Sequence, residues 1–350
     1  MMEPTVYHHS QPFELESGHI LPGLDIAYHT FGKLNANRDN VIWVCHALTA
    51  NSNVFEWWPG LFGEGDLFNP EDHFIICANN LASCYGTTGP LSLNPVTGRK
   101  WYNDFPSVTI RDMAGTLQLL KEYLKIDSIH TLIGGSQGGQ IAQEWSILHP
   151  QLSRHLILLA TNDIHSSWGI AFNESQRLAI KADATYGEAR DDAGAAGLKA
   201  ARSIALLSYR NYSTYELTQQ SRRNLRGYKA PAEYQQYQGE KLVKRFNAYS
   251  YVRLSEAMDG HDVYRNKSCA PEEVFRVVSI PALIIGVESD LLFPVAEQKA
   301  IASALPNATY VEIESDFGHD GFLIETDQIS AVIKGFYAQH DIKNYSKVLI

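Results

Sequence analysis

The sequence predicts an α/β protein with a mostly parallel sheet and an inserted helical lid. Short apolar runs of strand length alternate with longer stretches that carry apolar residues at helical spacing, a pattern typical of a parallel sheet covered by helices on both faces. The strand pattern stops after residue 160 and resumes at residue 281, with mainly helical spacing between them. We therefore expect a core domain formed by residues 1–163 and 275–350, and a helical lid domain formed by residues 164–274.

The individual elements follow from spacing and turn residues. A β-hairpin is expected over residues 13–31, with its turn at Pro22–Gly23. Further strands are expected at residues 41–45, 74–78, 129–133, 156–160, 281–286 and 309–313. Thr109 with Asp112 predicts the capped start of a helix that runs to Leu124, and a last helix is expected over residues 327–338. The lid is expected to hold helices at residues 176–182, 193–207, 233–243 and 252–258.

Composition narrows the class of protein. The 350 residues are 45% hydrophobic and 19% charged, as in ordinary globular proteins, and the net charge of −10 argues against nucleic acid or an anionic membrane as partners. No apolar run has the length of a membrane span, and no signal peptide is apparent. The four cysteines form no disulfide pattern and fit buried thiols in a reducing cytoplasm, so a cytoplasmic location is expected.

The chemistry is indicated by a glycine-rich turn at residues 134–139. An apolar run ends at Ile133, Ser136 stands between two pairs of glycines, and helical spacing follows through Trp145. A strand, Gly-x-Ser-x-Gly and a helix form a nucleophile elbow, in which a tight turn exposes the serine hydroxyl at the start of the helix. This motif is typical of the α/β-hydrolase fold, and we expect Ser136 to be the nucleophile.

A serine nucleophile needs a base, and the base needs a carboxylate that orients it. In the elbow fold the acid and then the histidine follow the serine in the chain. Asp290 and His319 fit, because each lies just after an expected strand; Glu288 is an alternative to Asp290. The other histidines at element boundaries, His130, His149 and His155, are expected at the surface.

Two backbone N–H groups should stabilise the negative oxygen of the transition state. One is expected from Gln137, directly after the nucleophile, and the other from Leu48, in the loop after the strand at residues 41–45. His46 is interpreted as a structural residue that shapes this loop.

Several segments together resemble the homoserine O-acetyltransferase family of the α/β-hydrolase fold. The similarity runs from about residue 13 to about residue 325 and includes the Gly-Gly-Ser-x-Gly-Gly elbow. The segments that carry it are residues 27–35, 45–49, 85–90, 104–112, 134–145 and 318–320 in the core, and 172–177, 197–202, 208–210 and 258–262 in the lid.

The resemblance implies a two-step acyl transfer. Ser136 would take an acetyl group from acetyl-CoA, and His319 would then activate the side-chain hydroxyl of L-homoserine, as in methionine biosynthesis. By position in the family's motifs, Arg202 would bind the substrate carboxylate, Asp320 would bind its amine, and Tyr209 would line the tunnel. The resemblance implies small-molecule substrates. The sequence has no zinc-type spacing and no dinucleotide fingerprint, so no metal and no permanently bound cofactor are expected. Apolar faces on the lid helices predict a homodimer through the lid, which the resemblance also suggests.

The chain departs from the family's usual pattern in the loop after Thr49, which reads Ala50-Asn51-Ser52 where a Gly and an acidic residue are expected, and beside the nucleophile. The family usually has Met after the nucleophile and again three residues later, where this chain has Gln137 and Gln140. Both are expected near the acyl pocket, so a succinyl donor, or serine or another alcohol as acceptor, stays open. A plain serine esterase is a further alternative; it would keep the triad but would not need Arg202 and Asp320 together. A non-catalytic binding protein is disfavoured because all three triad residues are present.

Overall fold

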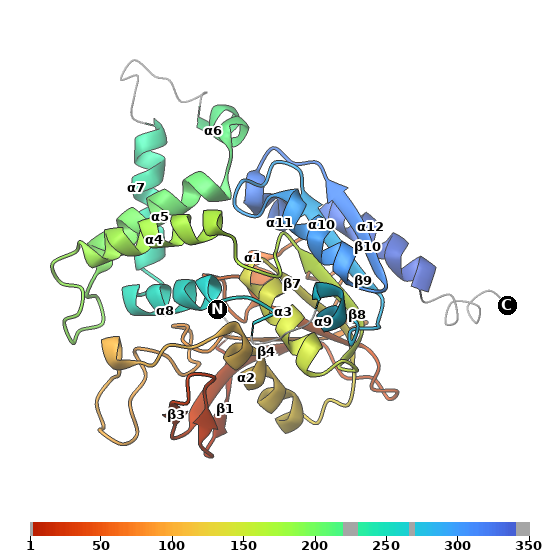
Figure 1. The fold of residues 1–350 in the computed structure, drawn as a ribbon, viewed down its shortest axis with the longest axis horizontal. Coiled ribbons are helices and arrows are strands. Elements are labelled where there is room, and N and C mark those ends of the chain that lie inside the picture. Colours follow the sequence, from red (N-terminus) through yellow and green to blue (C-terminus); the bar gives the residue numbers. More distant parts are fainter. Residues whose placement is uncertain (1–2, 220–229, 266–269, 341–350) are drawn as a thin grey trace.

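The computed structural model describes residues 3–219, 230–265 and 270–340. Its centre is an eight-stranded sheet in which the parallel strands are flanked at one edge by two antiparallel ones (Figure 1). In spatial order the strands are β1 (Thr5–His9), β4 (Leu24–Phe31), β6 (Phe74–Ala78), β5 (Val41–Cys45), β7 (Ile129–Gly135), β8 (Ser153–Leu159), β9 (Ala282–Val287) and β10 (Ala308–Ile313). The predicted mostly parallel sheet is therefore confirmed.

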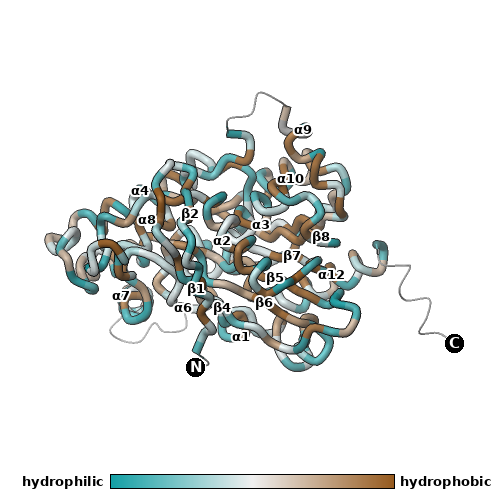
Figure 2. Tube along the Cα trace, turned by 90° about the horizontal axis from the view of Figure 1, so that it is seen from below, coloured by the Kyte–Doolittle hydropathy of each residue, from teal (hydrophilic) through white to brown (hydrophobic). Residues whose placement is uncertain are grey.

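Helices cover both faces of this sheet because side chains alternate along each strand. In β5, Val41 and Trp43 pack into one core with α2 (Ile110–Tyr123), α3 (Gln137–Leu148) and α10 (Val295–Ala304). Ile42 and Val44 point to the other face, where the core includes residues of α1 (Val54–Trp57) and α12 (Thr326–His340). Figure 2 shows the corresponding hydrophobic segments along the central strands.

The chain between β8 and β9 forms the helices beside the core in Figure 1. They are α4 (Ser167–Lys181), α5 (Ala195–Tyr209), α6 (Tyr212–Gln219), α7 (Ala230–Val243) and α8 (Ala248–Asp259), which we call the lid helices. α5 packs against α4, α7 and α8, and its C-terminal end contacts the short helix η3 (Gly318–Asp320) of the core. The last helix of the insertion, α9 (Pro271–Phe275), packs against α10 instead. No helix in the described ranges is long and apolar enough to span a membrane.

The predicted hairpin at residues 13–31 is wrong. Only β2 (Phe13–Glu14) and β3 (Ile20–Leu21) pair as a hairpin there, and β4 pairs instead with β1 and β6. The turn at Pro22–Gly23 separates β3 from β4 rather than joining two paired strands. The strand at Thr5–His9 was missed because its partly exposed edge position leaves no clear apolar pattern in the sequence.

Other elements match in type and differ at their ends. The strands at residues 41–45 and 74–78 are as predicted, and Thr109 forms the predicted capping box with Asp112. The lid helices α4 and α8 begin earlier than predicted, and α6 and α10 were not predicted at all.

His155 was expected at the surface, but it is buried in β8 and its ring packs against Phe336. Cys269, one of the four thiols, lies outside the described residues.

A buried carboxylate holds the nucleophile helix in place. Glu144 of α3 is fully buried and pairs with Arg111 of α2 at 3.1 Å and with Arg265, which follows the lid helices, at 2.5 Å. Glu16 also contacts both arginines, at 3.0 and 2.7 Å. Because the carboxylate is removed from water, these charge-assisted bonds offset its desolvation and fix α3 against both neighbours.

Candidate active site

Ser136 lies in the turn between β7 and α3, with backbone angles φ 56° and ψ −129°. A positive φ is strained for a residue with a Cβ, and the flanking glycines allow the turn to close. A Cβ at Gly138 would lie 2.0 Å from the Cys45 carbonyl oxygen, and one at Gly134 would lie 2.3 Å from the Gly138 oxygen. The first turn of α3 is thus pressed directly against the end of β5.

His319 and Asp290 are brought together by two different loops. The Nδ1 atom of His319 lies 2.7 Å from Oδ2 of Asp290, and both side chains are buried. The other Asp290 oxygen accepts the backbone N–H groups of Leu292 at 2.8 Å and Phe293 at 2.9 Å. An ionised Asp290 only accepts, so Nδ1 carries the proton and Nε2 is left as the basic nitrogen.

The surroundings of His319 fix the orientation of its imidazole. They do not include Glu288, the alternative acid. The ring of Phe293 stacks on that of His319 with 5.0 Å between centroids. Glu288 is exposed to solvent two residues before Asp290. The carboxylate beside His319 is therefore that of Asp290 and not that of Glu288.

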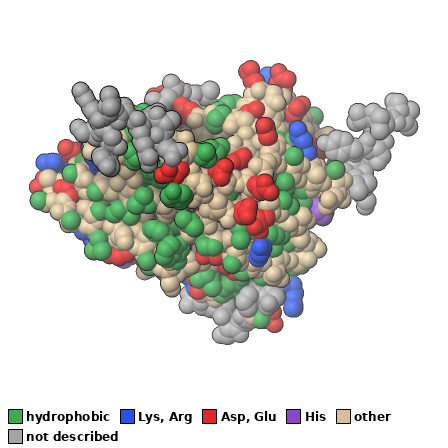
Figure 3. Space-filling model, turned by 90° about the horizontal axis from the view of Figure 1, so that it is seen from above, with side chains coloured by type: hydrophobic (Ala, Val, Ile, Leu, Met, Phe, Trp, Pro, Cys, Tyr) green, Lys and Arg blue, Asp and Glu red, His purple; other side chains and the backbone are tan. Residues whose placement is uncertain are grey.

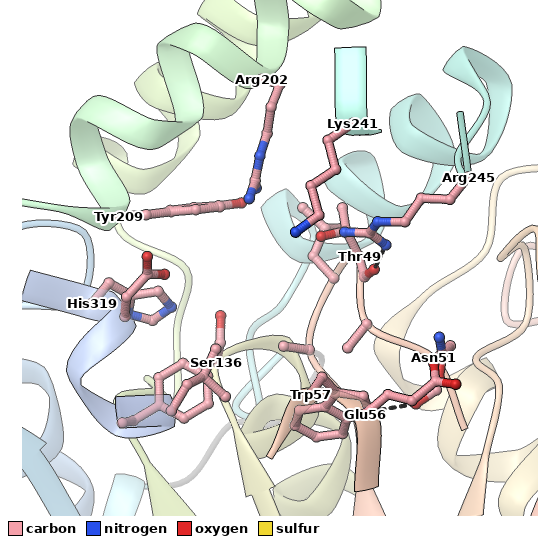
Figure 4. A pocket seen from close by; sticks show the side chains of 16 residues that line it. Thr49, Asn51, Glu56, Trp57, Ser136, Arg202, Tyr209, Lys241, Arg245 and His319 are labelled. Atoms are coloured by element: carbon pink, nitrogen blue, oxygen red, sulfur yellow. Dashed lines mark hydrogen bonds between the residues drawn. The ribbon is translucent and has the colours of Figure 1, made fainter. Parts of the chain in front are cut away.

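A cavity of about 370 Å³ joins Ser136 and His319 to the lid (Figure 4). Arg202 of α5 and Lys241 of α7 reach into it from above and Tyr209 of α5 from one side, while the loop after β5 forms another wall. The lining residues are Ala47, Leu48, Thr49, Ala50, Asn51, Glu56, Trp57, Ser136, Arg202, Tyr209, Lys241, Arg245, His319, Asp320, Phe322 and Leu323.

The charged groups in this cavity differ in how they are paired. Arg202 lies over the Tyr209 ring, 5.3 Å from its centroid, and pairs with no carboxylate among the residues that the structure describes. Asp320 is already paired: its Oδ2 accepts from Nε of Arg210 at 3.1 Å. Burial raises the pKa of Asp320, and the nearby Arg210 and Arg202 oppose that shift. Sequence reasoning did not single out Arg210, although it directly follows Tyr209.

The two expected oxyanion donors lie on either side of the close contact between α3 and β5. Leu48 lines the cavity, and Gln137 is the first residue of α3. His46, two residues before Leu48, is fully buried; its Nδ1 donates to the Ala47 carbonyl at 2.8 Å and its Nε2 accepts from the Asn80 N–H at 3.0 Å. The interpretation of His46 as a structural residue of this loop is confirmed.

The side chains of Gln137 and Gln140 do not line the cavity, so their expected place near the acyl pocket is corrected. The Gln137 amide donates to the Leu254 carbonyl of α8 at 3.0 Å, and the Gln140 amide donates to Asn162 at 2.8 Å. Both point into the packing between α3 and its neighbours. They therefore give no reason to expect a different acyl group.

Other lining residues were missed by sequence reasoning. Glu56 and Trp57 of α1, Lys241 of α7 and Arg245 after it belong to no motif, and only the cluster of basic residues 241–245 in an acidic chain was a signal. In the described part of the chain, no three His, Cys, Asp or Glu side chains are grouped so as to hold a metal ion.

Comparisons with known proteins show the family of the chain. A family model described as the alpha/beta hydrolase fold matches residues 40–326. The homoserine O-acetyltransferase of Cyclobacterium marinum is 44% identical over 97% of this chain and 97% of its own. That of Chlorobium luteolum is 41% identical over 96% of this chain and 95% of its own. The chain belongs to the homoserine O-acetyltransferase family.

Solved structures give the same fold. The homoserine O-acetyltransferase from Bacillus anthracis has a TM-score of 0.85 at 25% identity, covering 96% of this chain and 98% of its own. Esterase E22 also has a TM-score of 0.85, over 96% of this chain and all (100%) of its own, but at 21% identity it shows the fold alone. The family and the α/β-hydrolase fold predicted from sequence are therefore confirmed.

Asp290→Asn is expected to slow acylation of Ser136 by about 10³–10⁴-fold, because an amide stabilises the wrong histidine tautomer. The measurement is the burst of 4-nitrophenol released from 4-nitrophenyl acetate. Glu288→Gln is the matched control and should stay within about twofold of wild type, since a solvent-exposed carboxylate has no contact with His319. Equal losses in both variants would contradict the assignment of Asp290.

Proposed function

We propose that this protein transfers an acetyl group from acetyl-CoA to the side-chain hydroxyl of L-homoserine through an acetyl-Ser136 intermediate. The observation that carries the proposal is one cavity that combines Ser136 and His319 with Arg202 and Asp320. The first pair can make and break an ester, and the second pair offers opposite charges to an amino acid. The names of the relatives at 44% and 41% identity support the same reaction.

In the first half-reaction the Ser136 oxygen attacks the thioester carbon while its proton passes to Nε2 of His319. The carbonyl oxygen becomes negative and is held by the backbone N–H groups of Leu48 and Gln137. The carbon–sulfur bond then breaks, and the sulfur leaves as the CoA thiol with the proton from His319. Asp290 stabilises the imidazolium that forms between these two events.

In the second half-reaction the hydroxyl of homoserine loses its proton to His319 and attacks the acetyl carbon. The same two N–H groups hold the oxygen of the second tetrahedral intermediate. The bond to Ser136 then breaks and the proton returns to the serine oxygen. The enzyme is restored, and the acetyl group is now an ester of homoserine.

The lid residues give the acceptor a defined orientation. The guanidinium of Arg202 can bind a carboxylate through two N–H groups, and Asp320 can accept from an ammonium. Asp320 also pairs with Arg210 at 3.1 Å, whereas Arg202 pairs with no carboxylate in the described part of the chain and is left to meet that of a substrate. An esterase has no use for this pair, so it favours the amino-acid acceptor over water.

The outer part of the cavity suits the donor. Lys241 and Arg245 are exposed side chains that line the cavity, whereas Ser136 is buried at its inner end. Arg245 donates to Tyr85 and to the Thr49 carbonyl, which fixes its position. We infer that these two cations bind the phosphates of acetyl-CoA while the thioester reaches Ser136.

The proposed reaction is tested with acetyl-CoA and succinyl-CoA, each against homoserine, serine and water. We expect fast release of CoA, together with a product of the mass of O-acetylhomoserine, only with acetyl-CoA and homoserine. Higher kcat/KM with succinyl-CoA, with serine or with water would reassign the donor, the acceptor or the reaction class.

Arg202→Ala separates the two half-reactions in the same assay. It should raise the homoserine KM about 10–100-fold, because a charge-assisted hydrogen bond contributes about 1.5–3 kcal/mol. Acetylation of Ser136 by acetyl-CoA, followed by intact mass, should persist. Loss of that first step would mean that Arg202 acts on the donor instead.

The role of Lys241 can be tested with a shortened donor. Lys241→Glu should raise the KM for acetyl-CoA about tenfold, because it places a negative charge beside the phosphates. The KM for S-acetylpantetheine, which lacks those phosphates, should change less than twofold. Lys334→Glu on α12 is the matched control, since its charge change is equal and it does not line the cavity. An equal rise in KM for both donors would reject a phosphate contact.

We also infer a homodimer through the lid. Large apolar side chains on four lid helices are more than half exposed: Leu178 at 58%, Leu207 at 58%, Leu217 at 62% and Tyr237 at 59%. Figure 3 shows hydrophobic side chains gathered on the half of the surface that carries these helices. Burying them against a second copy is favourable. A solution mass of 39.1 kDa by light scattering, that of one chain, would overturn this inference.

We infer a cytoplasmic location from the cysteines. Cys45, Cys77 and Cys84 are all free thiols, and the first two are buried. Unpaired thiols fit the reducing cytoplasm, where acyl-CoA donors are also used.

A further inference from the structure

We propose that the Gln137 side chain, through Asn80 and His46, positions both oxyanion donors and couples them to the lid helix α8. The inference rests on the acyl-serine chemistry of the proposed function and adds a role for three side chains that do not line the cavity. All three are positioning residues, since none of their side chains reaches the reacting atoms.

The first connection is made by Gln137 itself. Its backbone N–H is the donor beside the nucleophile, and its side chain is fully buried. The amide nitrogen donates to the Leu254 carbonyl of α8 at 3.0 Å, and the amide oxygen accepts from the Asn80 side chain at 3.4 Å. Both ends of the carboxamide are used, so its direction is fixed by partners on two other elements.

The second connection runs from Asn80 to the loop that carries Leu48. Asn80 follows β6, and its side chain donates also to the His46 carbonyl at 3.3 Å. Its backbone N–H donates to Nε2 of His46 at 3.0 Å, so the proton of His46 is on Nδ1 and is given to the Ala47 carbonyl at 2.8 Å. Burial lowers the pKa of His46 to about 4, which keeps this neutral form at physiological pH.

These bonds form one buried path from α8 to both donors. Its members are the Leu254 carbonyl, the Gln137 side chain, Asn80, His46 and the Ala47 carbonyl next to Leu48. The two donors also sit on backbones in direct contact, since Gly138 leaves no space for a Cβ against Cys45. A shift of Gln137 therefore changes the distance between the two donors.

Gln140 provides a natural comparison within the same helix. It is one turn further along α3 and equally buried, and it is also a Gln where Met is usual. Its amide donates to Asn162 at 2.8 Å, but its oxygen has no partner among the described residues, and its bonds do not reach the Leu48 loop. Gln140→Met therefore measures the effect of losing one buried amide that has no connection to the oxyanion donors.

The experiment compares Gln137→Met with Gln140→Met in the full-length protein. The probe is 4-nitrophenyl acetate, whose burst gives the acylation rate and whose slow phase gives transfer to water. We expect Gln137→Met to lower both saturated rates about tenfold, with the KM for the ester within twofold of wild type, because the donors act in both tetrahedral intermediates. Gln140→Met should leave both rates within twofold. Equal rates for the two variants, or a change in KM alone, would overturn the proposal.

Asn80→Ala provides a second test of the proposal if Gln137→Met folds poorly. Asn80→Ala removes the middle of the path without changing a residue of α3, and it should also lower both saturated rates at unchanged KM. In the double variant the losses should not add, because both changes break one path. Additive losses would mean independent effects and would reject the coupling. Since this ester needs neither CoA nor homoserine, a wild type that acylates but ignores homoserine would overturn only the proposed acceptor.

Discussion

The backbone turn at Ser136 constrains everything around it. Its φ of 56° costs about 1–3 kcal/mol for a residue with a Cβ, so the turn must be held by its surroundings. Gly138 lets α3 contact the end of β5, and the Thr161 hydroxyl donates to the Ser136 carbonyl at 2.8 Å. The buried Glu144 fixes the helix further along. The same contacts that hold the strained turn also bring the loop of Leu48 beside the nucleophile.

The lid and the core each contribute side chains to the cavity around Ser136. The core alone supplies Ser136, His319 and Asp290, which suit any acyl transfer. Arg202 and Tyr209 come from α5, and the end of that helix packs on Gly318, whose φ of 62° brings the backbone of η3 close to Arg210. The end of the helix that carries Arg202 and Tyr209 is therefore fixed directly against the residue before His319. A change in the position of α5 would therefore move Arg202, Tyr209 and the backbone beside His319 together.

Sequence reasoning succeeded where the information is local. The elbow glycines, the Thr109 capping box and the apolar strands at residues 41–45 and 74–78 are all set by neighbours in the chain. It failed where partners are distant: β4 pairs with β1 and not with β3, and Asp320 pairs with Arg210, which is 110 positions away. It could also not tell that the Gln137 side chain turns away from the cavity, because helix geometry fixes where a side chain starts but not which partner it finds.

The orientation of the Gln137 side chain decides how its departure from the family's usual Met is interpreted. Had the amide faced the acetyl group, it would have placed polar atoms where a methyl must pack, and a different donor would follow. Facing α8 instead, it makes two hydrogen bonds with buried partners. Such bonds contribute only about 1 kcal/mol each to stability, yet they are directional where apolar packing is not. The Gln137 side chain therefore contributes to how the start of α3 is held between α8 and Asn80, and it does not line the cavity.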